Sequence, residues 1–268
     1  AAELTWLNRM PASLCRRVER VRLYAPNLRS LRLQSPGYYF LTTDTPNLMR
    51  WLADELRAQG VQLLLQHSFT GAERDGDAWR IDGIGRARYL IGADGAKSRV
   101  AQQAGLGRVR EFLYGVEYEF ADAQLREPEA LHCFISKHFA PGYIGWATQN
   151  PTGVQIGLAL RHRDAATRSP DIDGFLSRIR GPIGLPPMAH TAVRAGLIPC
   201  GGPVTPLAAP GAILTGDAAG IVSPVTAGGI HSAWKHGWAV GEAIAKHLRD
   251  GGPRPEKVAA DVAPRFRS

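Results

Sequence analysis

Residues 212–233 read Ala-Ile-Leu-Thr-Gly-Asp-Ala-Ala-Gly-Ile-Val-Ser-Pro-Val-Thr-Ala-Gly-Gly-Ile-His-Ser-Ala. The apolar run Ala212–Leu214 predicts a short buried strand, and the glycines and small residues that follow predict a tight turn. A long helix is expected from about Gly229 to Leu248. A strand, a glycine-rich turn and a helix in this order indicate a ligand-binding edge of an α/β sheet.

The chemistry of this stretch also points to a ligand. Asp217 stands where the strand ends and can accept hydrogen bonds from hydroxyl groups. The small residues after it let the backbone lie close to a bound group, and the free amides near Gly229 suit an electron-rich group. A purely structural turn is the alternative, but length, order and context favour binding. The residues expected to border the ligand are Gly216, Asp217, Ala218, Pro224, Gly228, Gly229 and Ile230.

A second motif, Tyr-Leu-Ile-Gly-Ala-Asp-Gly-Ala-Lys-Ser-Arg, occupies residues 89–99. A strand that ends in Gly92, a turn at Asp94 and Gly95, and a following helix place backbone amides and a carboxylate at the carboxyl end of a sheet. Ligands of α/β sheets bind at that end. An Asp-Gly turn is a weaker signal than the first motif, because ordinary turns also use this pair.

The pattern of elements changes along the chain. Helix and strand signals up to about residue 106 include a helix at Leu48–Gly60 and a strand at Val61–Leu65. Residues 107–197 carry the alternation of an antiparallel sheet. The first pattern returns in residues 198–250, and residues 251–268 form a tail. We therefore expect an α/β fold of mixed α+β type, in which a cofactor domain (1–106 and 198–250) is interrupted by a β-rich substrate domain.

The two motifs resemble the FAD-binding signatures of the geranylgeranyl reductase family, within the larger group of FAD-dependent aromatic hydroxylase-like flavoproteins. The segments 141–146 and 154–158 resemble the substrate-domain strand pair of these reductases. The resemblance implies a Rossmann-like FAD-binding domain, with NAD(P)H as a candidate electron donor. It implies that Asp217 contacts the pyrophosphate–ribityl region, that Gly228, Gly229 and Ile230 border the isoalloxazine, and that Asp94 and Gly95 lie near the cofactor.

One departure from the family concerns the ADP half of the cofactor. The family opens with a strand, a Gly-x-Gly-x-x-Gly turn and an acidic residue about 20 positions later, which hold the ADP half. This chain starts after the point where that unit would end, so the FAD-binding domain is expected to be partial. The expectation is a fragment, an omitted N-terminal segment, or a partner chain that supplies the unit.

Substrate-binding and catalytic candidates are fewer. Tyr143 and Trp146, expected on one strand, can wall an apolar tunnel for a small apolar substrate or simply form sheet core. His138, His231 and His236 are candidate proton donors, although a solvent-facing or structural histidine is the commoner case. Cys15, Cys133 and Cys200 lack metal-ligand spacing, and no Ser/His/Asp set stands out, which disfavours metalloenzyme and hydrolase classes. The catalytic residue is therefore left open.

The net charge of +8 is concentrated early, in Arg9, Arg16, Arg17, Arg20, Arg22, Arg29 and Arg32. This basic N-terminal segment indicates either a solvated face or peripheral contact with an anionic membrane. Nucleic-acid binding is not expected, because no binding module accompanies the charge. Without a signal peptide or a spanning segment, the expected location is cytoplasmic or membrane-peripheral.

These observations leave three alternative functions. The first is an FAD-dependent reductase or dehydrogenase that acts on an apolar, isoprenoid-like substrate. The second is an FAD-dependent monooxygenase of aromatic compounds. The third is a non-catalytic ligand-binding or partner protein that keeps the flavoprotein fold without its ADP-binding unit.

Overall fold

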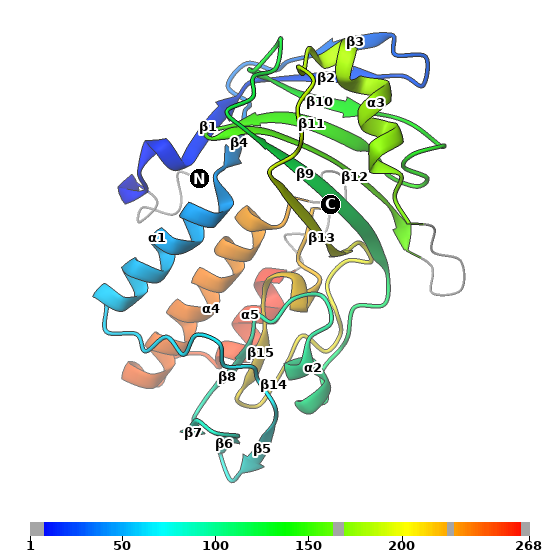
Figure 1. Cartoon of the computed structure of the whole chain (residues 1–268). Coiled ribbons are helices and arrows are strands. Elements are labelled where there is room, and N and C mark those ends of the chain that lie inside the picture. Colours follow the sequence, from blue (N-terminus) through cyan, green and yellow to red (C-terminus); the bar gives the residue numbers. More distant parts are fainter. Residues whose placement is uncertain (1–7, 163–168, 224–227, 264–268) are drawn as a thin grey trace. The chain divides into compact units, whose positions relative to one another are not determined.

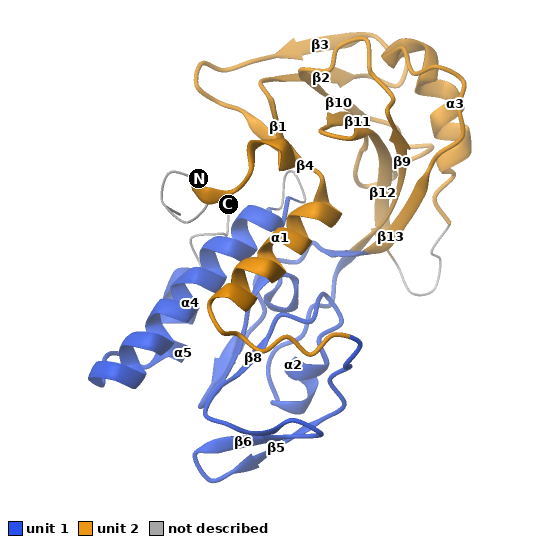
Figure 2. Ribbon diagram, turned by 60° about the vertical axis from the view of Figure 1, so that its left-hand side comes forward, with its two compact units in different colours: residues 1, 66–112, 197–268 blue, residues 2–65, 113–196 orange. Residues whose placement is uncertain are grey.

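A computed structural model of the chain describes residues 8–162, 169–223 and 228–263 (Figure 1). The chain divides into two compact units (Figure 2). The first unit contains residues 66–112 and 197–268, and the second contains residues 2–65 and 113–196. Helices and several separate sheets occur together, as expected for a mixed α/β chain.

The second unit is built around a seven-stranded sheet. Its strand order is β13 (Ala192–Pro199), β9 (Phe112–Ala121), β12 (Gly153–His162), β11 (Gly145–Asn150), β10 (Ala130–Phe134), β2 (Arg20–Tyr24) and β3 (Ser30–Leu33). The pairs β10–β11, β11–β12 and β2–β3 are antiparallel, while β2 and β10 pair in parallel. The predicted antiparallel sheet is thus present, and it extends to strands from the N-terminal segment.

One face of this sheet is covered by helix α3 (Ile172–Ile183). The helix begins after Asp171, whose carboxylate accepts the N–H of Gly174 at 3.0 Å. Phe175 and Ile179 of the helix join Ile156 and Leu158 of β12 in one apolar core, and each of these side chains is at most 2 % exposed. Burying one such side chain contributes roughly 1.5–3 kcal/mol, so this layer holds the sheet unit together.

The N-terminal part of the second unit contains a short 3-10 helix, η2 (Ala12–Leu14), a strand pair and a helix. Strand β1 (Cys15–Val18) pairs antiparallel with β4 (Phe40–Thr43), and α1 (Thr45–Ala58) follows directly. Asp44 caps α1 by accepting the N–H of Asn47, which explains why the helix begins earlier than its apolar periodicity predicts. The predicted strand at Val61–Leu65 is wrong, since these residues have no strand conformation and no partner strand.

Among the described residues, the first unit contains two small sheets and three α-helices. In one sheet, β15 (Ala212–Leu214) pairs in parallel with β8 (Leu90–Gly92) and antiparallel with β14 (Ala208–Ala209). The other is the antiparallel meander β5 (Ala72–Asp75), β6 (Ala78–Ile81) and β7 (Gly85–Ala87). The helices are α2 (Arg99–Gln103), α4 (Ile230–Asp250) and α5 (Pro255–Val262).

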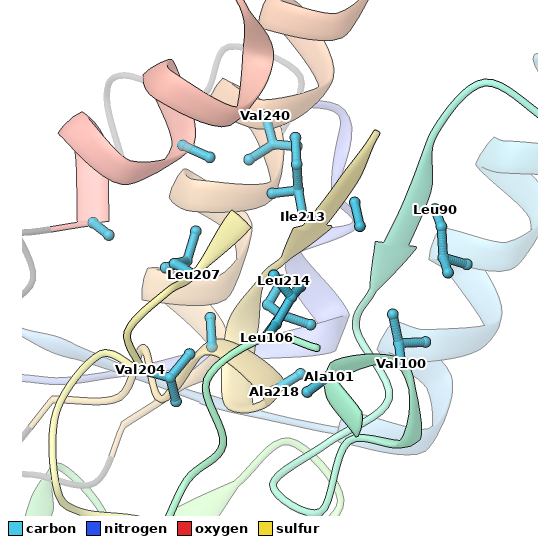
Figure 3. Packing of buried hydrophobic residues seen from close by; sticks show 14 of the residues in the cluster. Leu90, Val100, Ala101, Leu106, Val204, Leu207, Ile213, Leu214, Ala218 and Val240 are labelled. Carbon is cyan, nitrogen blue, oxygen red and sulfur yellow. The ribbon is translucent and has the colours of Figure 1, made fainter. Parts of the chain in front are cut away.

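The core of the first unit forms around β15, which is buried along its whole length. Ile213 and Leu214 pack with Val100 of α2 and Val240 of α4 (Figure 3). This core fixes the two ends of β15, and the candidate site begins at its carboxyl end. Among the described residues, no helix combines the length and the apolar character that a bilayer crossing demands.

The compact units divide the chain at positions other than the predicted domain boundaries. Residues 2–65 belong to the sheet unit rather than with residues 66–106, because β2 pairs with β10 from Arg20↔Ala130 to Tyr24↔Phe134. The predicted tail 251–268 contains α5, which contributes Ala259 to the core. The functional roles given to the predicted ranges 1–106, 107–197 and 198–250 stay predictions.

Candidate functional site

The glycine-rich turn after β15 is a tightly packed 3-10 turn, η3 (Gly216–Ala219). Gly216 and Gly220 have φ angles of 58° and 69°, which glycine adopts without strain. A side chain on Gly220 would overlap the carbonyl oxygen of Gly202. Ala218 is 1 % exposed. The small residues are therefore required for the turn to fold, whatever it binds.

Asp217 is the one acidic residue of this turn, and it lies at the end of β15 with a partly buried side chain. Burial raises the pKa of its carboxyl group. Its Oδ1 atom faces Gly229, where an added Cβ would lie 3.2 Å away. Among the described residues, no hydrogen bond to this carboxylate is formed. Asp217 thus keeps unused acceptor capacity beside a glycine.

Helix α4 begins directly after Gly229, which has no side chain that could cap the first turn. The Gly229 carbonyl accepts the N–H of Ala233 at 2.8 Å, and the Gly228 carbonyl accepts the N–H of Ser223 at 3.3 Å. Ile230 is 41 % exposed. The start of α4 therefore lies against the Asp217 carboxylate. Pro224, also predicted to border the ligand, lies outside the described residues.

The second motif lies beside the first, because β8 and β15 run parallel. Gly92 pairs with Leu214, and the Gly92 carbonyl accepts the N–H of Thr215 at 2.9 Å. A Cβ on Gly92 would lie 2.6 Å from the Leu214 side chain, so only glycine allows this approach. Both motifs consequently follow the carboxyl ends of neighbouring parallel strands, as the sequence indicates.

Asp94 has a structural role in this arrangement. Its Oδ1 accepts the hydroxyl of Ser98 at 2.6 Å, and its Oδ2 accepts the N–H groups of Arg99 and Val100 at 2.7 and 3.1 Å. The carboxylate thus holds the start of α2. Gly95 has a φ of 84°, and an added Cβ would meet nothing within 4 Å. Of the two motif aspartates, Asp217 has the more available carboxylate.

His236 is fully buried behind the first motif. Its Nε2 donates to the Ala259 carbonyl at 3.1 Å, so its Nδ1 accepts the Thr215 hydroxyl at 2.9 Å. Burial lowers the pKa of His236. This histidine joins β15, α4 and α5 and is too enclosed to be a proton donor to a substrate. His138 is exposed, and His231 is exposed near the start of α4.

The candidate substrate residues lie in the sheet unit. Trp146 is on β11, but Tyr143 lies in the turn before it, so the prediction that they share a strand is wrong. The Trp146 indole lies across Gly157, its partner on β12, where a Cβ would overlap the ring. Burial and the neighbouring Cys133 raise the pKa of Tyr143 to about 12. The substrate role of both residues stays a prediction.

A polar network that the sequence reasoning missed holds Trp146 in place. The indole N–H donates to Glu117 of β9 at 3.1 Å, and Arg194 of β13 pairs with both Glu117 and Glu119 at 3.1 and 2.6 Å. Burial raises the pKa of Glu117 against the opposing effects of Trp146 and Arg194. The alternation of glutamates along β9 was the available signal, but the pairing with Arg194 spans 77 residues. Within the described part of the chain, no cluster suited to a metal ion is present.

Comparison with known proteins shows a matching family and similar relatives. The family model described as FAD binding domain matches residues 16–255. A Digeranylgeranylglycerophospholipid reductase of Methanocaldococcus jannaschii is 26 % identical over 75 % of this chain and 54 % of its own length. Digeranylgeranylglycerophospholipid reductase 2 of Methanothermobacter thermautotrophicus is 27 % identical over 92 % of this chain. The chain spans 54 % of the first relative and 66 % of the second, which is less than two thirds of each.

A solved structure has a fold similar to that of this chain. The crystal structure of a geranylgeranyl bacteriochlorophyll reductase-like protein from Thermoplasma acidophilum matches with a TM-score of 0.79 and 20 % identity. The match covers 97 % of this chain and 71 % of that chain. The predicted resemblance and the predicted mixed α/β flavoprotein fold are confirmed.

Proposed function

This chain belongs to the FAD binding domain family, and from that premise we propose that it forms the flavin- and substrate-binding part of an FAD-dependent reductase. We propose an apolar isoprenoid lipid as its substrate, with a carbon–carbon double bond as the group that is reduced. The relatives named for digeranylgeranylglycerophospholipid reduction support this choice, since they match 75–92 % of the chain.

The observation that carries the proposal is the meeting of two glycine motifs at the carboxyl ends of β8 and β15. Asp217 has a half-buried carboxylate that is free to accept hydrogen bonds, and the glycine at 229 leaves room beside it. These features fit a ligand that brings hydroxyl groups to Asp217 and a flat, electron-rich ring to the start of α4. The ribityl chain and flavin ring of FAD have this chemistry.

FAD would supply the hydride chemistry when it is bound. The chain would orient it: Asp217 would accept hydrogen bonds from the ribityl hydroxyls, while Gly228, Gly229 and Ile230 would border the ring. Asp94 would act indirectly by holding the loop around Gly95. In the sheet unit, Trp146 and Tyr143 offer apolar surface to a substrate, and the Glu117 network keeps the indole fixed.

The proposal is tested by flavin uptake followed by turnover. The purified chain should take up added FAD and turn yellow. With FAD reduced by NADPH, NADH or dithionite under nitrogen, it should saturate a geranylgeranyl lipid, detected as a gain of hydrogen by mass spectrometry.

Three results would redirect the assignment. Strict dependence on oxygen, with oxygen incorporated into product, would replace the reductase by the monooxygenase. A chain that never takes up flavin would favour a non-catalytic binding protein. Flavin uptake with no turnover on any isoprenoid lipid would overturn the substrate class and leave the cofactor assignment intact.

A further inference from the structure

The first unit has a surface cleft at the end of its sheet that lies away from the glycine motifs. The cleft has a volume of about 330 Å³ and is lined by residues that precede β8 and β15, together with parts of β5, α5 and the end of α4. This volume is at the lower end of the range for small-molecule sites, roughly 300–1,000 Å³. The residues of this cleft have no role in the proposed flavin site.

The floor of the cleft is formed at Gly211, which has a φ of 70°. A Cβ at this position would lie 2.9 Å from Arg74 Nη1 and 3.1 Å from Trp79 Nε1. The Arg88 carbonyl oxygen lies 3.0 Å from the same point, so neighbouring atoms close the space that a side chain would fill, and a ligand must bind outside it. The Trp79 indole N–H is buried and has no hydrogen-bond partner among the described residues. It is closed to solvent and Trp79 does not line the cleft, so it takes no part in ligand binding.

Cations from separate segments gather around this floor. Arg74 comes from β5, Arg88 from the loop before β8, and Arg254 from the cap of α5. Arg74 is held by the Pro210 carbonyl at 2.9 Å and by the Trp79 ring. Arg88 and Arg254 form no ion pair within the part of the chain that the structure describes. Their charges are thus available to a ligand.

Two carboxylates also line the cleft, but both are engaged. Glu256 accepts the N–H of Gly211 at 2.7 Å, and Asp77 lies 3.5 Å from Arg86. Burial and the Glu256 carboxylate raise the pKa of the Tyr89 phenol, and Arg88 and Arg254 oppose them with smaller effects. The three arginines outnumber the two carboxylates that line the cleft, so the lining has a positive formal charge.

We propose that this cleft binds a phosphate monoester. Such a group carries two negative charges and three terminal oxygens, so it can accept hydrogen bonds from the guanidinium groups of Arg74, Arg88 and Arg254 at the same time. A carboxylate offers two oxygens and one charge and should bind more weakly. The phosphate can belong to a soluble metabolite or to a lipid headgroup, since the recognised group is the same in both.

Calorimetric titration of the full chain with glycerol 3-phosphate and with inorganic phosphate tests the proposal. We expect saturable binding of one equivalent, with acetate binding at least about tenfold more weakly. The double variant Arg88→Gln/Arg254→Gln should weaken phosphate binding at least about tenfold, because charge-assisted hydrogen bonds are lost. Arg80→Gln, which changes an exposed arginine paired with Glu73 outside the cleft, is the matched control.

Vesicles separate the two sources of phosphate. At physiological salt, retention on phosphatidate vesicles that exceeds retention on phosphatidylglycerol vesicles assigns the lipid source, provided that glycerol 3-phosphate competes with the excess and the double variant loses it. Binding of soluble phosphate without such retention assigns the soluble source. If neither ligand binds, or if Arg80→Gln weakens binding as much as the double variant, the proposal is overturned.

Folding and flavin binding are measured separately in every variant. Circular dichroism establishes that each variant is folded, which is expected because Arg88 and Arg254 are exposed. Flavin uptake should be unchanged, because the cleft and the Asp217 turn lie at opposite ends of β15. Failure of phosphate binding with normal flavin uptake would therefore reject the cleft without affecting the proposed function.

Discussion

Asp217 and Asp94 stand in similar Gly-Asp and Asp-Gly turns, yet their surroundings give them different tasks. Three hydrogen bonds from Ser98, Arg99 and Val100 occupy the Asp94 carboxylate. Asp217 has a raised pKa because of burial and faces Gly229. A carboxylate that is partly desolvated and not hydrogen-bonded gains most when a ligand donates to it.

We therefore expect Asp217→Ala to weaken FAD binding by roughly 10- to 100-fold, the cost of losing a hydrogen bond to a charged group. Quenching of flavin fluorescence gives the Kd. Asp250→Ala is the control, since Asp250 is an exposed residue at the end of α4 that pairs with Arg249. Equal Kd values for Asp217→Ala and the unaltered chain would exclude Asp217 from the site.

His132 makes the stability of the sheet unit depend on pH. It is 1 % exposed, its Nδ1 lies 3.0 Å from the Tyr24 hydroxyl, and its Nε2 lies 3.2 Å from the Glu127 carbonyl. Burial, with a smaller contribution from Arg22, lowers the pKa of His132 from 6.5 to about 4. The unfolded chain consequently binds a proton more readily than the folded chain between these two pH values.

Stability should therefore be complete above about pH 6.5 and should decrease as the pH falls toward 4. One pKa unit corresponds to about 1.4 kcal/mol. The shifted pKa of His132 should therefore lower the free energy of unfolding by about 2 kcal/mol between pH 7 and pH 5. Urea unfolding at both pH values, compared with the same measurement on His132→Gln, isolates this contribution. A pH-dependent loss of the same size in the variant would show that other groups cause it.

At the scale of elements, the sequence predicts those with strong local signals. The helix near Leu48, the strand Ala212–Leu214 and the long helix after Gly229 are present, because periodicity and glycine turns are local properties. Val61–Leu65 has the composition of a strand but no partner, and Leu65 is 69 % exposed. The sequence reasoning also did not find that β2 joins the large sheet beside β10, because pairing across about 110 residues leaves no local pattern.

The same limit applies to the candidate site. Asp217, Gly216 and Gly229 were predicted because they are close together in the sequence. The contact of Glu117 with Trp146 and Arg194, and the meeting of Arg74, Trp79 and Gly211, depend on strand register and chain crossing. Such groups are found only when the fold is known.

Strand β3 is the element that we propose for contact with an anionic membrane. It is exposed along its whole length, with Leu31 and Leu33 60 % and 44 % exposed at the edge of the sheet. Of the basic N-terminal segment, Arg9, Arg17, Arg22 and Arg32 form ion pairs, so part of its charge is neutralised. Apolar side chains next to the remaining charge favour an anionic interface.

We expect vesicles that contain phosphatidylglycerol to retain the chain at low salt. Leu31→Ser/Leu33→Ser should weaken this retention by about tenfold, since two leucine side chains would no longer enter the interface. Met49→Ser/Leu56→Ser is the matched control. It changes two apolar residues of α1 that are each 44 % exposed. Retention that is absent at low salt, or that both double variants weaken equally, would contradict a role for β3.

At the scale of the whole molecule, the glycine motifs of this chain are assigned to the flavin half of FAD and not to its ADP half. The 268 residues contain both glycine motifs assigned to the flavin side but no Gly-x-Gly-x-x-Gly stretch, the usual grip on the ADP half. The Asp217 turn and the start of α4 lie in one unit with its own core, and we propose that this unit makes the flavin contacts.

This chain should therefore bind FMN, which lacks the AMP part of FAD, with a Kd within about threefold of that for FAD. A tenfold preference would require about 1.4 kcal/mol of contacts to that AMP part. At a concentration 100 times the Kd, either ligand should stabilise the fold by about 2.7 kcal/mol and raise the thermal midpoint equally. Fluorescence titration and thermal unfolding measure both quantities, with Asp217→Ala expected to lose both ligands together. If FAD binds more than about 30-fold more tightly than FMN, residues of this chain must grip the ADP half without the family's usual motif.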